Sequence, residues 1–214
     1  LVFSGAEEFV NKMKEAGNTP NNDIIGKFGL GFYSAFMVAK KVEVETLSMT
    51  EGSVATKWSC EGNPEYSFEN SNKTDVGTTI TLYLDAESEE FANSWKVSST
   101  LKKFCDFMPY PIKVTDIEAK KNEDGTSDEP GIINDTHPLW KKDPTSVTDD
   151  EYKAFFSKLF PMDPTPLFWI HLKVDHPFIL EGILYFPKFN PQKSPITENN
   201  IRLYNKQVFV SNNV

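Results

Sequence analysis

The sequence predicts an α+β protein built in two parts. Glycine and proline are unevenly distributed: eight of the 11 glycines lie at or before Gly77, and 12 of the 14 prolines lie at or after Pro109. In both parts, some stretches carry apolar residues at helical spacing and others alternate apolar with polar residues, as half-buried antiparallel strands do. Helices mixed with a mostly antiparallel sheet are the α+β pattern.

The first part opens on a capping box, Ser4-x-x-Glu7, which predicts a short amphipathic helix over about residues 6–15. A glycine-rich segment then leads into the apolar, glycine-free run 32–39, which we interpret as a buried helix. Three runs with a period of two follow and predict an antiparallel meander with one buried face: Val42–Thr46, Val54–Trp58 and Ile80–Leu84.

An apolar stripe predicts one helix over about residues 88–107, which Pro109 and Pro111 stop, and a strand follows over 112–115. Residues 118–131 contain no large apolar side chain and are interpreted as a solvated linker between the two parts. A long hairpin loop inside one domain is the alternative that the sequence leaves open.

The second part begins with another capping box, Thr148-x-x-Glu151, which predicts a helix whose apolar side chains follow at i, i+3, i+4 and i+7. Three strands are expected after it, over Leu167–Leu172, Ile179–Phe186 and Ile201–Val210.

Composition excludes several classes of protein. The 22 Lys and Arg against 31 Asp and Glu give a net charge of −9, which argues against a nucleic-acid partner or an anionic lipid surface. No apolar run approaches the ~20 residues of a membrane span. Cys60 and Cys105 form no C-x-x-C pair, which favours reduced thiols. The chain begins without methionine, so we expect a piece of a longer protein.

One segment invites a ligand. Gly26-x-x-Gly29-x-Gly31 stands at the expected start of a helix, where glycines allow close backbone approach and free N–H groups favour a phosphate. A P-loop is excluded because Phe28, not Ser or Thr, follows Lys27, and the glycine order differs from a dinucleotide fingerprint. A purely structural glycine turn remains an equal alternative. His171 and His176 have no third ligand nearby, so no metal site is expected.

The stretch from Ile25 to Ser34, Ile-Gly-Lys-Phe-Gly-Leu-Gly-Phe-Tyr-Ser, closely resembles the glycine-rich lid hinge of the heat shock protein 90 family of chaperones, and most closely its bacterial HtpG branch. Further segments follow the same family in order, over nearly the whole chain. They are Ser4-Gly5, Gly77–Ile80, Phe107–Ile112, Pro138–Trp140, Thr148–Tyr152, Pro166-Leu167, Ile183–Pro187, Leu203-Tyr204 and Val208–Val210.

The resemblance implies a fragment of an ATP-dependent chaperone, an ATPase that binds and remodels unfolded clients through ATP-driven lid and domain closure. It implies that residues 1–118 are the C-terminal part of a GHKL-type two-layer α/β sandwich, with 1–31 the lid. A charged linker over 119–131 and the first part of an α/β middle domain over 132–214 would follow. A homodimer, in the bacterial cytoplasm, is implied for the full-length parent.

The resemblance also assigns residues. The backbone segment that wraps the ATP phosphates matches Gly26, Phe28, Gly29, Leu30, Gly31 and Phe32, and the threonine near the adenine matches Thr78. The family's catalytic glutamate, Mg²⁺-binding asparagine and adenine-reading aspartate precede the lid, so none lies in this chain. We therefore expect the parent to use ATP with Mg²⁺ and the fragment to bind ATP weakly and not to hydrolyse it.

Two residues near the end are candidates for a catalytic role. In the resembling family a middle-domain arginine reaches the γ-phosphate, and Gln207 stands at the matching position. Lys206 is the neighbouring cation, but on an extended strand the two side chains would point to opposite faces, so Lys206 qualifies only in a loop or bulge. A competing interpretation is a non-catalytic protein-binding module, with Trp140 and Trp169 presented to partners and a structural glycine turn.

Overall fold

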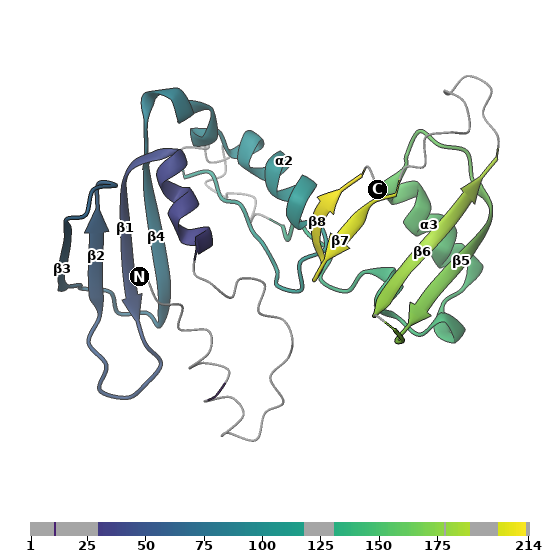
Figure 1. Cartoon of the computed structure of the whole chain (residues 1–214), viewed down its shortest axis with the longest axis horizontal. Coiled ribbons are helices and arrows are strands. Elements are labelled where there is room, and N and C mark those ends of the chain that lie inside the picture. Colours follow the sequence, from purple (N-terminus) through teal and green to yellow (C-terminus); the bar gives the residue numbers. More distant parts are fainter. Residues whose placement is uncertain (1–10, 12–29, 118–130, 178, 189–200, 213–214) are drawn as a thin grey trace, which may run out of the picture. The chain divides into compact units, whose positions relative to one another are not determined.

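A computed structural model describes residues 11, 30–117, 131–177, 179–188 and 201–212 of the 214. Its contacts divide the chain into two compact units, residues 1–97 and 98–214, and each mixes helix with antiparallel sheet (Figure 1). The α+β expectation is confirmed at this level. The charged segment 119–131 lies outside the described residues except for Gly131, so the expected domain boundaries stay a prediction. Among the helices described, none is long and apolar enough to cross a membrane.

Unit 1 is built on a four-stranded sheet. Its strands are β1 (Ala39–Leu47), β2 (Thr56–Cys60), β3 (Tyr66–Asn70) and β4 (Gly77–Leu84), all antiparallel to their neighbours. The order across the sheet is β3-β2-β1-β4 (Figure 1), so the fourth strand returns to pair with the first, as in a Greek key. The expected simple meander is therefore wrong in its last step, and β3 was not predicted.

Two expected helices differ from the structure. The first is a 3-10 helix, η1 (Leu30–Met37), and it is not buried throughout, because Met37 is 79% exposed. Phe32 packs against Trp58 and Phe36, whereas Tyr33 and Met37 are exposed.

The expected helix over 88–107 is two helices, η2 (Ala86–Ala92) and α2 (Ser94–Cys105). Asn93 adopts an extended backbone between them, and its Oδ1 accepts the Lys96 N–H at 3.0 Å. This is the geometry of a helix N-cap, which starts a new helix and does not continue the old one.

Unit 2 holds two short 3-10 helices, η3 (Leu139–Lys141) and η4 (Pro144–Ser146), followed by helix α3 (Asp149–Leu159). Strands β5 (Pro166–Val174) and β6 (Leu180–Pro187) form one antiparallel pair, and β7 (Leu203–Asn205) and β8 (Val208–Ser211) form another. Its core is largely aromatic: Phe107, Leu139, Tyr152 and Phe155 are buried, with Trp140, Trp169 and Tyr204 packed against them.

The capping box that opens α3 is present as predicted. The Glu151 N–H donates to Thr148 Oγ1 at 3.3 Å, and Glu151 Oε2 accepts the Thr148 N–H at 2.9 Å. His171 serves this core, because its two ring nitrogens lie 2.7 Å from the Tyr152 hydroxyl and 3.1 Å from the Trp140 carbonyl oxygen.

The strand expected over 112–115 is reduced to a single bridge between Lys113 and Ile132. Near this bridge, backbone hydrogen bonds join the residues before the charged segment to the residues after it. The Ile133 N–H donates to the Ile112 carbonyl at 3.0 Å and the Asp135 N–H to the Asp106 carbonyl at 2.7 Å. Residues 106–113 therefore belong structurally with residues 131–135.

Candidate functional site

The glycine-rich loop enters the described structure only at its end. Gly26, Phe28 and Gly29 lie outside the described residues, and η1 begins at Leu30. Gly31 is exposed, and a Cβ built on it would meet no atom within 4 Å. Its φ is not in the left-handed region, so the fold of this chain does not itself require glycine there.

Phe32 fastens η1 to the sheet. Its ring meets Trp58 of β2 edge to face, with 5.6 Å between centroids, and Phe36 at 6.3 Å. The side chain of Phe32 thus holds the helix in place, while the role implied by the resemblance concerns its backbone.

Thr78 lies on the sheet face that η1 covers. Thr78 of β4 pairs with Thr46 of β1, and Val44, two residues earlier, pairs with Trp58. Side chains two residues apart share a face, so Thr78 and Trp58 do as well. The Thr78 and Thr46 hydroxyl oxygens lie 2.9 Å apart, and Thr78 is exposed. The structure therefore brings the start of η1 and Thr78 to one side of the sheet.

The opposite face is charged. Glu43 accepts from Lys41 at 2.8 Å, from Lys57 at 3.1 Å and from the Tyr83 hydroxyl at 2.9 Å. These hydrogen bonds, that of Lys41 first, lower the pKa of Glu43 to about 2. The face is a network of paired charges on strands β1, β2 and β4.

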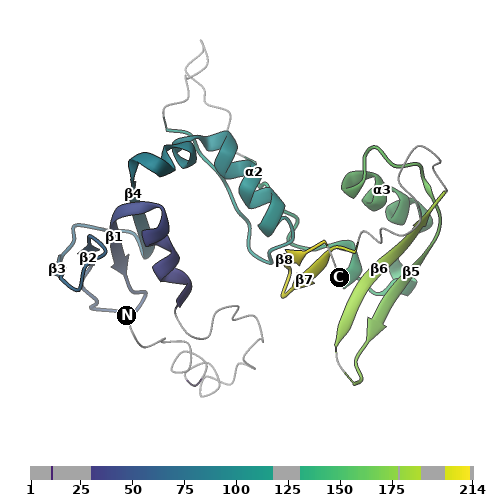
Figure 2. The same ribbon diagram turned by 45° about the horizontal axis from the view of Figure 1, so that its top comes forward.

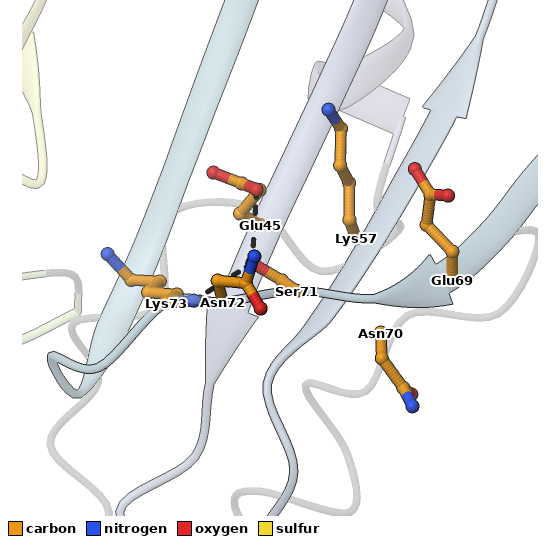
Figure 3. A pocket seen from close by; sticks show the side chains of 7 residues that line it. All are labelled: Glu45, Lys57, Glu69, Asn70, Ser71, Asn72 and Lys73. Atoms are coloured by element: carbon orange, nitrogen blue, oxygen red, sulfur yellow. Dashed lines mark hydrogen bonds between the residues drawn. The ribbon is translucent and has the colours of Figure 1, made fainter.

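A polar hollow of about 480 Å³ lies on this charged face (Figure 3). Ser71 donates to Glu45 at 3.0 Å beside it, and the backbone N–H of Lys73 donates to Ser71 at 3.1 Å. Two carboxylates and two lysines give the lining no net charge, and Thr78 lies on the other side of the sheet. The hollow therefore lies on the sheet face opposite to Thr78 and η1. It is lined by Glu45, Lys57, Glu69, Asn70, Ser71, Asn72 and Lys73.

Lys206 and Gln207 do not lie on one extended strand. They form the two-residue turn between β7 and β8, and both have positive φ, 49° and 65°. The strand expected over Ile201–Val210 is therefore wrong, and the alternation argument against Lys206 no longer applies. Lys206 lies in a turn, which is the backbone geometry that the sequence analysis required for its proposed role.

Gln207 has a task that the sequence did not reveal. Its Nε2 donates to the Phe107 carbonyl oxygen at 2.6 Å, across 100 residues of chain. Figure 2 shows the β7–β8 hairpin beside the C-terminal end of α2. Arg202, the sole arginine in the sequence, donates to the Leu159 carbonyl at 3.3 Å and stacks 4.7 Å from the centroid of Phe160.

The two tryptophans singled out for partner binding pack within unit 2. Trp140 meets Phe107 at 4.5 Å between centroids, and Trp169 stacks on Tyr152 at 5.1 Å. Among the described residues, no three His, Cys, Asp or Glu side chains gather where they could hold a metal ion.

The sequence is similar to one family model and to several named proteins. Residues 116–214 match the family model described as Hsp90 protein. The whole chain is 48% identical to "Chaperone protein htpG" of Bacteroides fragilis strain 638R and to "Chaperone protein HtpG" of Porphyromonas gingivalis strain ATCC 33277, covering 31% of each. It is 30% identical over 98% of its length to "Chaperone protein HtpG" of Myxococcus xanthus, covering 33% of it.

The chain thus spans about a third of the length of these relatives. Over its whole length the chain is similar to bacterial HtpG proteins, and its second part matches the Hsp90 family model.

Proposed function

We propose that the parent of this chain is an ATP-dependent molecular chaperone that binds and remodels unfolded or partly folded client proteins. The observation that carries the proposal is the 48% identity, over the whole chain, to proteins named as HtpG chaperones. ATP-driven closure of a lid and of the domains would couple nucleotide hydrolysis to client remodelling. The parent would act as a homodimer in the bacterial cytoplasm.

Within this proposal, residues 1–118 form the C-terminal part of a GHKL-type nucleotide domain, with the lid over 1–31. Residues 119–131 are the charged linker and 132–214 the start of the middle domain. The common sheet face of η1 and Thr78 supports the first assignment, because a two-layer sandwich needs its helices on one face of the sheet.

In this proposal the nucleotide contacts come from one backbone segment and two side chains. The N–H groups of Gly26, Phe28, Gly29, Leu30, Gly31 and Phe32 would cradle the phosphates, and the Thr78 hydroxyl would hydrogen-bond near the adenine. The open space around Gly31 and the exposed Thr78 support these roles. ATP with Mg²⁺ would supply the phosphoanhydride that is hydrolysed once the lid and domains have closed over it, and we expect the metal ligands in the parent outside this chain. Lys206 would contact the γ-phosphate and offset its negative charge.

The competing function, a non-catalytic protein-binding module, depended on Trp140 and Trp169 being available to partners. Both rings instead pack against other aromatic side chains of unit 2. This packing favours the chaperone proposal.

Two measurements test the proposal. The full-length parent should release phosphate from ATP and reduce aggregation of a chemically denatured test protein in an ATP-dependent way. Phosphate release no faster than the uncatalysed background would contradict it. The isolated chain should bind ATP weakly or not at all in calorimetry, because it supplies only part of a nucleotide pocket. Sub-micromolar affinity would indicate a complete and different site.

A further inference from the structure

The hydroxyl of Thr78 has a hydrogen-bond partner, Thr46, for which the sequence analysis predicted no role. Thr78 of β4 is the register partner of Thr46 on β1, and the two strands lie side by side in the sheet (Figure 1). The two hydroxyl oxygens lie 2.9 Å apart, and either group can be the donor. Hydrogen bonds between threonines that face each other across two strands help to stabilise antiparallel sheets. The two hydroxyls therefore form one hydrogen-bonded pair on the η1 face of the sheet.

This hydrogen bond restricts the direction of the Thr78 side chain. A threonine has three staggered χ1 rotamers, and each of them points Oγ1 in a different direction relative to the strand. Only a rotamer that points Oγ1 towards β1 allows the 2.9 Å contact with Thr46. Both residues are exposed, so neighbouring side chains restrict the rotamer less than they would in the core. Thr46 is therefore the group that determines where the Thr78 oxygen lies.

The surface next to the pair is apolar. Ile80 and Leu82 follow Thr78 at intervals of two residues on β4, so their side chains lie on the same face of the sheet. Ile80 is 54% exposed and Leu82 is 41% exposed. Small-molecule sites combine an apolar wall with a few placed polar groups, and a nucleobase has flat apolar faces and a polar edge. Apolar side chains beside a pair of hydroxyls suit such a ligand.

The pair also offers both kinds of hydrogen-bonding group. Each hydroxyl has one hydrogen and two lone pairs. One hydrogen is used between the two oxygens, so one hydrogen and the remaining lone pairs are left for a ligand. The edge of a purine carries donors and acceptors next to each other. The hydroxyl pair is therefore complementary to a purine edge.

We propose that Thr46 is a positioning residue for nucleotide binding: its hydroxyl, hydrogen-bonded to Thr78, holds the Thr78 oxygen where it contacts the edge of the purine. This inference rests on the proposed function, in which Thr78 lies near the adenine. Thr46 acts through Thr78 and does not itself need to touch the nucleotide. The residues that carry the inference all lie in unit 1.

Nucleotide binding by the full-length parent tests the proposal. Thr46→Val keeps the branched shape of the side chain but removes the hydroxyl, and we expect calorimetry to show ADP binding weakened about five-fold, as for one lost hydrogen bond. Thr46→Ser keeps the hydroxyl and should bind ADP nearly as wild type does. Thr81→Val, on the opposite face of β4, is the matched control and should leave binding unchanged. Equal ADP affinity in Thr46→Val and wild type would overturn the proposal.

A double-mutant cycle separates positioning from a contribution that Thr46 makes on its own. If Thr46 acts through Thr78, Thr78→Val should weaken ADP binding at least as much as Thr46→Val, and the double variant should match Thr78→Val. Additive losses in the double variant would show that Thr46 acts independently of Thr78, against the proposal. The unfolding midpoint should change little in each variant, because both hydroxyls are exposed.

A measurement without nucleotide keeps the inference separate from the proposed function. Three-bond scalar couplings, measured by NMR on this 214-residue chain, report the χ1 rotamer of Thr78. We expect one dominant rotamer in wild type and in Thr46→Ser, and rotamer-averaged couplings in Thr46→Val. Averaged couplings in wild type would overturn the positioning role even if the parent binds ADP. If the wild-type parent does not bind ADP, the proposed function fails, and the couplings still decide whether Thr46 fixes Thr78.

Discussion

Asn134 joins the two flanks of the charged segment through a single side chain. It is 9% exposed, and its Nδ2 donates to the carbonyls of Met108 at 2.9 Å and Tyr110 at 2.8 Å. Its Oδ1 accepts the Ile112 N–H at 2.8 Å. Three of the four hydrogen bonds that an amide can make are therefore used. Leaving one such buried partner unsatisfied costs about 1–3 kcal/mol.

Gly31 offers a clean test of the proposed phosphate contact. We expect Gly31→Val in the full-length parent to abolish ATP turnover, because a branched side chain at the start of η1 would occupy the space into which a phosphate must come. The unfolding midpoint should change little, since a Cβ there meets nothing within 4 Å and the φ is not left-handed. Steady-state phosphate release and thermal unfolding measure the two effects.

Gly131→Val is the matched control. Gly131 is equally open and also has no left-handed φ, but it lies far along the chain from the glycine-rich loop. It should retain turnover. Normal hydrolysis by Gly31→Val would show that the glycine turn is structural only.

The sequence could not assign the tasks of Asn134 and Gln207. Nothing in the sequence near Asn134 distinguishes it from the other asparagines, because its hydrogen-bond partners are backbone groups of residues 108–112, more than 20 positions earlier. Gln207 lies in a turn without the Asn-Gly or Asp-Gly signal of two-residue hairpins, so apolar alternation on both sides predicted one continuous strand. Thr78, by contrast, was proposed from the resemblance, and its place on the η1 face agrees with that role without testing it.

At the level of elements, several local signals predicted the right element, but long-range pairing was not predictable. The capping box of α3 and the existence of strands β1, β2, β4, β5 and β6 follow from nearby residues alone. The pairing of β4 with β1, in place of β3, is a choice between distant segments that alternation does not encode. The break at Asn93 was missed because apolar residues keep helical spacing on both sides of it.

Helix α3 carries a pH-dependent contribution to stability. A hydrogen bond from Lys142, together with those from Thr148, lowers the pKa of Glu151 to about 2 from its ordinary 4.5. Because the folded pKa is the lower one, ionised Glu151 stabilises the fold above pH 4.5, and this contribution is lost as the pH falls towards 2.

We therefore expect Glu151→Gln, which can still complete the capping box, to be less stable than wild type at pH 6 and similar to it near pH 2. Thr148→Ala should cost about 1 kcal/mol across this range by removing the cap itself. Urea unfolding at several pH values measures the stability of both variants. Hydrogen exchange of the α3 amides then shows whether the loss of stability lies in this helix. A constant gap between Glu151→Gln and wild type from pH 6 to 2 would contradict the charge argument.

On the scale of the whole molecule, the charged segment connects two flanks that are already held together. The Lys113–Ile132 bridge, two backbone hydrogen bonds and the Asn134 side chain fasten residues 106–113 to residues 131–135, all within unit 2. The segment proposed as the charged linker therefore begins and ends at two flanks that are bound to each other within unit 2.

This arrangement predicts the result of cutting the chain there. A specific protease site with Gly-Ser flanks, inserted between Lys121 and Asn122, should yield two pieces that separate on a denaturing gel but co-elute on gel filtration. They should stay together because the flank contacts and the packing of Phe107 against Trp140 and Tyr204 join them without the peptide bond. Asn134→Ala in the cut protein should weaken the association, whereas Asn72→Ala, at an exposed position in unit 1, should not. Pieces that separate on gel filtration as soon as the site is cut would show that residues 119–131 are a simple linker.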